Sequence, residues 1–127
     1  MTMKSKVAIV TGGGTGVGRE TALSLARLGC HVLINYSVSR EEAEQTAKDV
    51  ATSGVRSIAV RADVADDFAC REMVATACSQ LGGVDILVNC AGTTQFIPFH
   101  DLDQVSDDIW DRLYKVNVVG AFHCARA

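Results

Sequence analysis

A glycine-rich stretch, Thr11 to Gly18, directly follows an apolar run and has the composition of an anion-binding loop. It holds five glycines in eight positions. Glycine lets main-chain N–H groups come close to a bulky anion, and a helix that begins in such a loop adds unpaired N–H groups and the positive end of its dipole. The chemistry expected here is recognition of a phosphate or diphosphate by the backbone.

Two familiar phosphate-binding patterns do not fit this loop. A triphosphate-binding loop, GxxxxGK followed by Ser or Thr, needs a lysine and a hydroxyl where the chain has Arg19 and Glu20. The spacing GxGxxG needs its third glycine at a position that holds Val17 or Arg19. The pattern that remains is TGxxxGxG.

The three glycines of TGxxxGxG have separate expected roles. Gly12 permits the tight turn out of the strand, Gly16 the close approach of backbone to a diphosphate, and Gly18 the packing of the following helix on the sheet. A glycine-rich turn without a ligand is the alternative. Five glycines after a buried strand carry an entropic cost that a plain turn does not require, so the anion-binding interpretation is preferred.

The elements that must hold this loop form a regular series. Apolar, β-branched runs begin 25 to 28 residues apart, at Val7, Val32, Ile58 and Ile86. Continuous apolar strands are typical of a parallel sheet covered on both faces. Helical stretches are expected at 16–28, 39–53, 67–81 and from 106 to the end. The sequence predicts one α/β domain over residues 1–127: the first four βα units of a doubly wound parallel sheet of Rossmann type, with a crevice at the carboxyl ends of strands one and four.

The composition favours small-molecule chemistry over binding to nucleic acid or membranes. The chain is 48% hydrophobic and 21% charged, and its net charge of −3 provides no basic surface for a polyanion. No apolar run reaches the roughly 18 residues that span a bilayer and no secretion signal is evident, so a cytoplasmic location is expected. The five cysteines lack CxxC spacing and the three histidines are scattered, so we expect reduced thiols and no metal site.

Three further motifs follow the glycine loop in order. Asp63-Val64 comes after the third strand, NCAG (Asn89 to Gly92) after the fourth, and VNVVG, which contains Asn117, lies in the last helix. With these motifs the chain resembles, over essentially all 127 residues, the classical short-chain dehydrogenase/reductase family, especially members akin to 3-oxoacyl-acyl-carrier-protein reductases. The resemblance implies the N-terminal half of an oxidoreductase that transfers a hydride between a nicotinamide dinucleotide and a small-molecule carbonyl or alcohol. It also implies a homo-oligomer, a tetramer that uses the last helix as an interface.

The resemblance assigns roles to single residues. Asp63 would accept a hydrogen bond from the adenine amino group, and the Val64 N–H would contact the ring; a turn-starting aspartate is the alternative. Ala91 and Gly92 would pass beneath the cofactor ribose, while Asn89 braces the sheet. The implied cofactor-binding residues are Gly12, Thr15, Gly16, Val17, Gly18, Tyr36, Ser37, Ser39, Arg40, Asp63, Val64, Asn89, Ala91 and Gly92.

Asn117 is the one catalytic candidate in the chain. It lies four residues after Leu113 and therefore shares the apolar face of the last helix, so we expect a buried amide that must find hydrogen-bond partners. In the family this asparagine holds a water in a proton relay. The alternative is a structural asparagine that pairs with stray backbone groups.

The end of the second strand favours NADP over NAD. An acidic residue there would bind the ribose hydroxyls of NAD and repel the extra phosphate of NADP, and the chain has Asn35, Tyr36 and Ser37 instead. Ser39 and Arg40 follow and could supply a hydroxyl donor and a cation. The same two residues could equally be a helix N-cap and a solvated first-turn side chain.

The acid expected for carbonyl reduction is absent from this chain. The family pattern YxxxK is not met, because Tyr36 is followed four residues later by Arg40, and Tyr114 by Val118. We expect the catalytic tyrosine and lysine beyond Ala127, since the final residues remain helical in pattern and strand four would otherwise be an uncovered edge. A non-catalytic dinucleotide-binding module is the main alternative, and a methyl-donor-binding domain is a weaker one.

Overall fold

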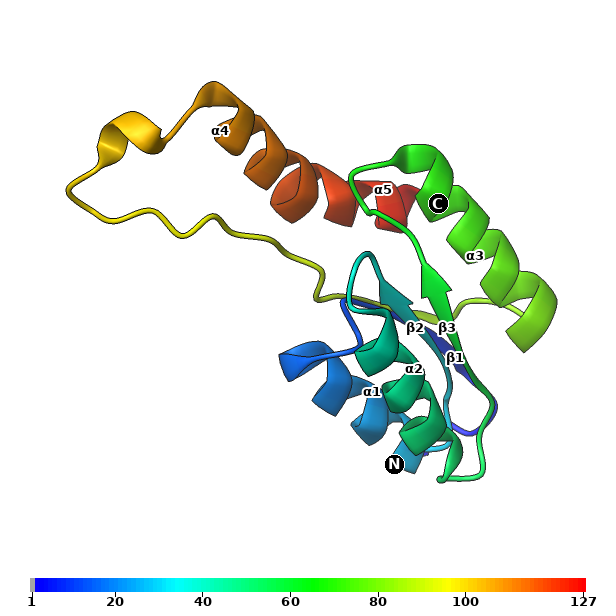
Figure 1. Cartoon of the computed structure of the whole chain (residues 1–127). Coiled ribbons are helices and arrows are strands. Elements are labelled where there is room, and N and C mark those ends of the chain that lie inside the picture. Colours follow the sequence, from blue (N-terminus) through cyan, green and yellow to red (C-terminus); the bar gives the residue numbers. More distant parts are fainter. Residues whose placement is uncertain (1) are drawn as a thin grey trace.

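The computed structural model describes residues 2–127, and these form a parallel sheet with helices on both faces (Figure 1). The four strands are ordered β3-β2-β1-β4, so the chain crosses to the far side of β1 to add the last strand. The strands are β1 (Val7–Thr11), β2 (His31–Tyr36), β3 (Ser57–Arg61) and β4 (Ile86–Asn89). This is the predicted doubly wound Rossmann-type sheet, with β1 and β4 adjacent.

Two helices cover each face of the sheet. One face carries α1 (Gly16–Arg27) and α2 (Arg40–Ala51), and the other carries α3 (Asp67–Leu81) and α5 (Gly120–Arg126) (Figure 1). Neighbouring strand residues point to opposite faces, so Val10 and Ile34 pack against α1 and α2, whereas Ile9 and Leu33 pack against α3 and α5. The central strands β1 and β2 are therefore buried on both sides, as expected, whereas the outer strands β3 and β4 are only partly buried.

Glycines end the helices where the sequence predicts. Gly29, Gly54 and Gly82 have φ of 95°, 82° and 102°, the left-handed region in which glycine stops a helix without strain. Helices α1 and α2 end one or two residues before the predicted limits, and α3 has the predicted bounds. Ser106 caps the last helix, because its hydroxyl accepts from the Ile109 N–H at 3.4 Å.

The last helix is one continuous rod with an irregular centre. It consists of α4 (Asp107–Tyr114), a π-helical turn η2 (Lys115–Val119) and α5, which packs on α3 (Figure 1). No residue of α4 is buried within the part of the chain that the structure describes. The long connection before it projects beyond the sheet and contains a short helix, η1 (Leu102–Gln104). None of the helices within residues 2–127 is long and apolar enough to cross a membrane.

Candidate functional site

A crevice of about 500 Å³ opens at the carboxyl ends of the strands. Four chain segments and the last helix converge on it, although they are far apart in the sequence. Every predicted cofactor-binding residue lines it except Arg40 and Asn89. The lining residues are Gly12, Gly14, Thr15, Gly16, Val17, Gly18, Asn35, Tyr36, Ser37, Val38, Ser39, Ala62, Asp63, Val64, Cys90, Ala91, Gly92, Thr93, Arg112 and Val116.

The glycines of the loop divide into structural and open positions. A Cβ on Gly18 would lie 2.3 Å from the Gly12 carbonyl oxygen, so only glycine lets α1 pack against the strand exit there. Gly12 has φ +58° and Gly16 has φ +52°. Apart from its chain neighbours and the backbone of α1, no atom of residues 2–127 lies within 4 Å of a Cβ built on Gly16, and this position lines the crevice at the start of α1. The backbone there is accessible to an anion.

A buried asparagine fixes this loop to the sheet. The Asn35 side chain, 1% exposed, accepts from the Gly12 N–H at 3.3 Å and donates to the Ala62 carbonyl at 3.0 Å. The Asn35 carbonyl also accepts from the Gly13 N–H at 3.0 Å. Because its polar atoms are engaged inside the protein, Asn35 positions the loop.

Thr11 performs the bracing that we had expected of Asn89. The buried Thr11 hydroxyl accepts from the N–H groups of Cys90 at 3.1 Å and Ala91 at 3.0 Å, and so fixes the NCAG segment beside β1. Asn89 pairs with Thr11 through the β1–β4 ladder, but its side chain is exposed and forms no hydrogen bond within residues 2–127. Sequence reasoning missed the Thr11 hydroxyl, although Thr11 begins the glycine motif.

The corner at the end of β2 differs from the prediction in one residue. Tyr36, Ser37 and Ser39 line the crevice as predicted. Arg40 lies outside the lining and pairs with Glu44 one helical turn along α2, at 2.8 Å. Arg40 thus matches the solvated first-turn alternative, because a carboxylate in reach on its own helix engages the guanidinium.

A cation that the sequence analysis overlooked lies beside this corner. Arg61, at the end of β3, pairs with Tyr36 in the sheet register, and its Nε donates to the Ser37 carbonyl at 3.1 Å. The contact places a guanidinium against the turn that carries Ser37 and Ser39. Only strand pairing brings these residues together, so the linear sequence shows no motif for it.

Asp63, which lies two residues after Arg61, lines the same crevice and has two partners. Its Oδ1 accepts from the Ala65 N–H at 3.0 Å, and its Oδ2 pairs with Arg112 Nη1 of α4 at 2.9 Å. Partial burial on its own raises the pKa of Asp63, but the hydrogen bonds from Ala65 and Arg112 outweigh it, so the pKa lies below its usual value. Asp63 is therefore a fixed, ionised acceptor.

The neighbouring Val64 is held by the last helix. Its carbonyl accepts from Nδ1 of the buried His123 at 2.8 Å. A Cβ on Gly120 would lie 2.5 Å from Val64 Cγ2, so the helix can approach Val64 this closely only at a glycine. Contacts from two helices thus hold this segment: α4 pairs with Asp63, and α5 contacts Val64.

Asn117 lies in the π-helical turn and is exposed, so the predicted burial of its amide is wrong. The reason is that α4 rises away from the sheet and leaves this part of the rod uncovered. The Asn117 side chain accepts from the Thr93 N–H at 2.8 Å and donates to the Thr93 carbonyl at 2.9 Å. It therefore holds the backbone that follows Gly92 at the edge of the crevice.

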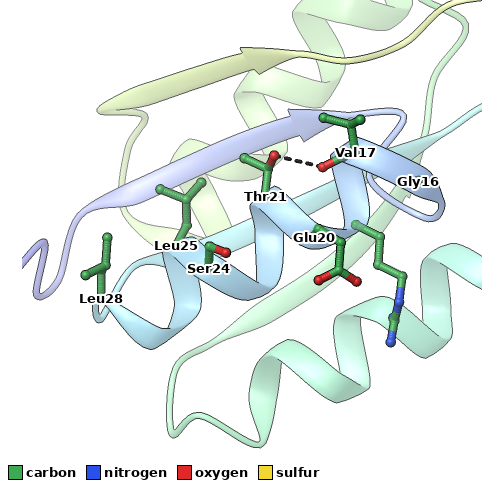
Figure 2. Close-up of a pocket in the computed structure, with 8 residues that line it drawn as sticks. Gly16, Val17, Glu20, Thr21, Ser24, Leu25 and Leu28 are labelled. Atoms are coloured by element: carbon green, nitrogen blue, oxygen red, sulfur yellow. Dashed lines mark hydrogen bonds between the residues drawn. The ribbon is translucent and has the colours of Figure 1, made fainter.

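A second hollow, of about 660 Å³, runs along the outer side of α1 (Figure 2). Val17, Leu25 and Leu28 lie along one side of the helix there, and the Thr21 hydroxyl donates to the Val17 carbonyl of its own helix at 2.8 Å. Polar groups do not converge on this groove as they do on the crevice. Within residues 2–127 no cluster of three or more His, Cys, Asp or Glu side chains could hold a metal ion.

A Rossmann-like sheet with a glycine loop at the start of its first helix is typical of dinucleotide-binding proteins. Comparison with known proteins identifies the family within that class. The sequence pattern of the short chain dehydrogenase family matches residues 6–127. The chain belongs to the short-chain dehydrogenase/reductase family, whose members are oxidoreductases that use a nicotinamide dinucleotide.

The chain is similar to relatives of different lengths. It is 39% identical to a short-chain dehydrogenase/reductase homolog, YusS, of Bacillus subtilis, covering 86% of this chain and 100% of that protein. It is 41% identical to a short-chain type dehydrogenase/reductase of Picea abies, covering 95% of this chain and 46% of the relative. A 3-oxoacyl-acyl-carrier-protein reductase, FabG, of Staphylococcus epidermidis is 38% identical, over 94% and 48% of the two chains.

A solved structure agrees with the fold. A short-chain dehydrogenase/reductase from Burkholderia xenovorans superposes with a TM-score of 0.90 at 33% identity, over 99% of this chain and 51% of that one. Apart from YusS, which it covers completely, the chain spans about half the length of these relatives.

Proposed function

We propose that residues 1–127 are the dinucleotide-binding domain of an NADP(H)-dependent oxidoreductase that interconverts a small-molecule carbonyl and its alcohol. The observation that carries the proposal is the crevice itself: an open backbone position at Gly16, the helix start behind it, and an ionised acceptor at Asp63 face the same space. A diphosphate would bind the N–H groups that begin α1. The adenine would then lie toward Asp63 and Val64, and the nicotinamide ribose over Ala91 and Gly92.

The bound cofactor supplies the hydride, and the residues of this chain orient it. Asn117 is the proposed relay residue of this half. Its amide can form four hydrogen bonds and uses two on Thr93, which leaves an acceptor and a donor for a water molecule. The proposed acid and base, a tyrosine and a lysine, would come from chain beyond Ala127.

The preference for NADP follows from the corner at the end of β2. None of residues 35–39, which line the crevice at this corner, has an acidic side chain that would repel a phosphate, and Ser37 and Ser39 are among them. Arg61 contacts the Ser37 carbonyl and so places a guanidinium beside the turn, whereas Arg40 is paired with Glu44 on α2. The free cysteines are consistent with a reducing compartment, and a cytoplasmic location remains part of the proposal.

Fluorescence titration of the chain with NADPH and NADH tests the cofactor assignment. We expect NADPH to bind about tenfold more tightly, because a hydrogen bond to a charged group contributes roughly 1.5–3 kcal/mol. Replacing Arg61 with Met should reduce that preference while NADH binding is unchanged. Equal or reversed affinities in the unmodified chain would contradict the assignment of Ser37, Ser39 and Arg61 to the second phosphate.

A non-catalytic dinucleotide-binding module is a second candidate, favoured by one observation: the chain covers the full length of the similar protein YusS. The two proposals differ in whether the protein catalyses the oxidation of NADPH. An assay of NADPH oxidation with small ketones, run on the natural protein, should show activity if a tyrosine and lysine follow this domain. Tight binding without oxidation would support the module.

A further inference from the structure

The adenine end of the crevice contains a carboxylate and a guanidinium side by side. Asp63 Oδ2 and Arg112 Nη1 are 2.9 Å apart, and both residues line the crevice. They are 49 positions apart in sequence and come from the loop after β3 and from α4. The ion pair therefore lies in the wall of the crevice and joins α4 to the loop after β3.

The hydrogen-bond capacity of the pair is only partly used. A carboxylate offers about four acceptor sites, and Asp63 uses one for the Ala65 N–H and one for Arg112. A guanidinium has five N–H donors, and within residues 2–127 Arg112 has no second side-chain partner. The pair thus keeps free acceptor sites on Asp63 next to free donors on Arg112, and its two side chains are 42% and 51% exposed.

The position of this pair is fixed from both sides. Ala65 holds Asp63 from its own loop, and Val64 is held by His123 and packed against Gly120. Arg112 belongs to the same continuous helix as His123 and Gly120. The donor and acceptor therefore keep their relative places, which base recognition requires.

We propose that Arg112 is a specificity-determining residue for the adenine end of the dinucleotide, fixing the Asp63 carboxylate to accept from the 6-amino group and placing its own donors toward an adjacent ring nitrogen. The inference rests on the proposed function, because it takes the crevice to be the dinucleotide site. An acceptor beside a donor complements the adenine edge, on which an amino group lies beside a ring nitrogen acceptor. Arg112 acts in part through Asp63 and is to that extent a positioning residue.

Hypoxanthine presents the opposite pattern to the same pair. Its 6-position is a carbonyl and its N1 carries a hydrogen, so in the pose of adenine it would place an acceptor against the Asp63 carboxylate and a donor against the Arg112 guanidinium. An unsatisfied polar group costs about 1–3 kcal/mol, which corresponds to roughly 5- to 150-fold in affinity.

The test is the ratio of dissociation constants for NADPH and its hypoxanthine analogue, measured by fluorescence titration of the full chain. We expect the unmodified chain to bind NADPH at least about tenfold more tightly than the analogue. Arg112→Met should bring the two affinities within about threefold, because the carboxylate keeps only its hydrogen bond from Ala65 and the guanidinium donors are gone. Arg112→Lys, which keeps the charge but not the planar group, should give an intermediate ratio.

Arg71→Met is the matched control. Arg71 pairs with Asp67 at 3.0 Å on α3, is also 51% exposed and lies outside the crevice lining, so its replacement should leave the ratio unchanged. An unmodified chain that binds both dinucleotides equally, or an Arg112→Met variant with the original ratio, would overturn the inference and leave the proposed function standing. A chain that binds neither dinucleotide would contradict the proposed function itself.

Discussion

At the scale of single residues, two glycines of the same loop have different structural roles. Gly18 is required by packing, since its neighbour Gly12 leaves no room for a side chain, whereas Gly16 borders open space. The sequence predicted both roles from the spacing TGxxxGxG. The structure adds that a Cβ at Gly16 would meet open space, apart from its chain neighbours and the backbone of its own helix.

Gly16→Val should abolish binding of NADPH and NADH while the protein stays folded. The left-handed backbone at Gly16 costs a side-chain-bearing residue about 1–2 kcal/mol, and the added methyls block approach of the diphosphate. Fluorescence titration should show affinity reduced at least about tenfold, since each charge-assisted hydrogen bond contributes roughly 1.5–3 kcal/mol. Gly54→Val has the same kind of backbone strain and open surroundings away from the crevice, and it should bind normally. Unchanged binding by Gly16→Val would contradict the loop assignment.

The thiols should differ strongly in reactivity. Burial, and to a lesser degree the neighbouring Cys124, raises the pKa of Cys70 to about 12, and burial also raises the pKa of Cys124. Cys78 is exposed and Cys90 is half-buried in the crevice lining. At pH 8, a disulfide reagent should label Cys78 first and Cys70 and Cys124 only after unfolding, because the thiolate is the reactive form.

Saturating NADPH should slow the labelling of Cys90 and leave Cys78 unaffected. The reason is that Cys90 lines the proposed cofactor crevice, whereas Cys78 lies on α3. Mass spectrometry after timed labelling gives both rates in one sample. Equal Cys90 rates with and without NADPH would argue against dinucleotide binding in this crevice.

At the scale of the elements, the strands and the regular helices could be predicted from the sequence, whereas the π-helical turn in the last helix could not. Strong apolar runs and glycine stops determine the βα units, and these are local features of the sequence. The π-helical turn at Lys115–Val119 has no comparable local signal, and the exposure of Asn117 depends on how α4 leaves the sheet. The partners of Thr11, Asp63 and Val64 are likewise long-range: His123 and Val64 are 59 residues apart, so no spacing rule could reveal the contact.

Thr11→Val should destabilise the junction between β1 and the segment after β4. The substitution keeps the shape of the side chain but leaves two partly buried N–H groups, those of Cys90 and Ala91, without their acceptor. We expect a loss of about 1–3 kcal/mol in the free energy of unfolding, measured by urea denaturation. Thr21→Val is the control, since the Thr21 hydroxyl is exposed and bonds only within α1, and it should cost less than about 0.5 kcal/mol.

At the scale of the whole molecule, the rod formed by α4, η2 and α5 leaves an apolar stripe uncovered. Trp110, Tyr114, Val118 and Phe122 recur every four residues and are between 51% and 64% exposed. Four residues bring a helix back to nearly the same face, so the side chains form one continuous surface. We propose that this stripe is an interface of the homo-oligomer that the family resemblance implies, a tetramer with the last helix at an interface.

Trp110→Asp should shift the protein toward smaller species. Placing a charge within the apolar stripe leaves that charge buried without a partner if the stripe is an interface. Analytical ultracentrifugation should show a mass above that of one chain for the unmodified protein and a lower mass for the variant. Phe68→Asp, on the exposed side of α3, should leave the mass unchanged. A monomeric unmodified protein would contradict the proposed assembly.

The central claim is that backbone N–H groups at the start of α1 bind the diphosphate of a nicotinamide dinucleotide. A crystal structure of the chain with NADPH tests it most directly. We expect the diphosphate within hydrogen-bond distance of the main chain between Gly16 and Gly18, with the adenine against Asp63. A dinucleotide seated elsewhere, with the mouth of this helix vacant, would contradict the account.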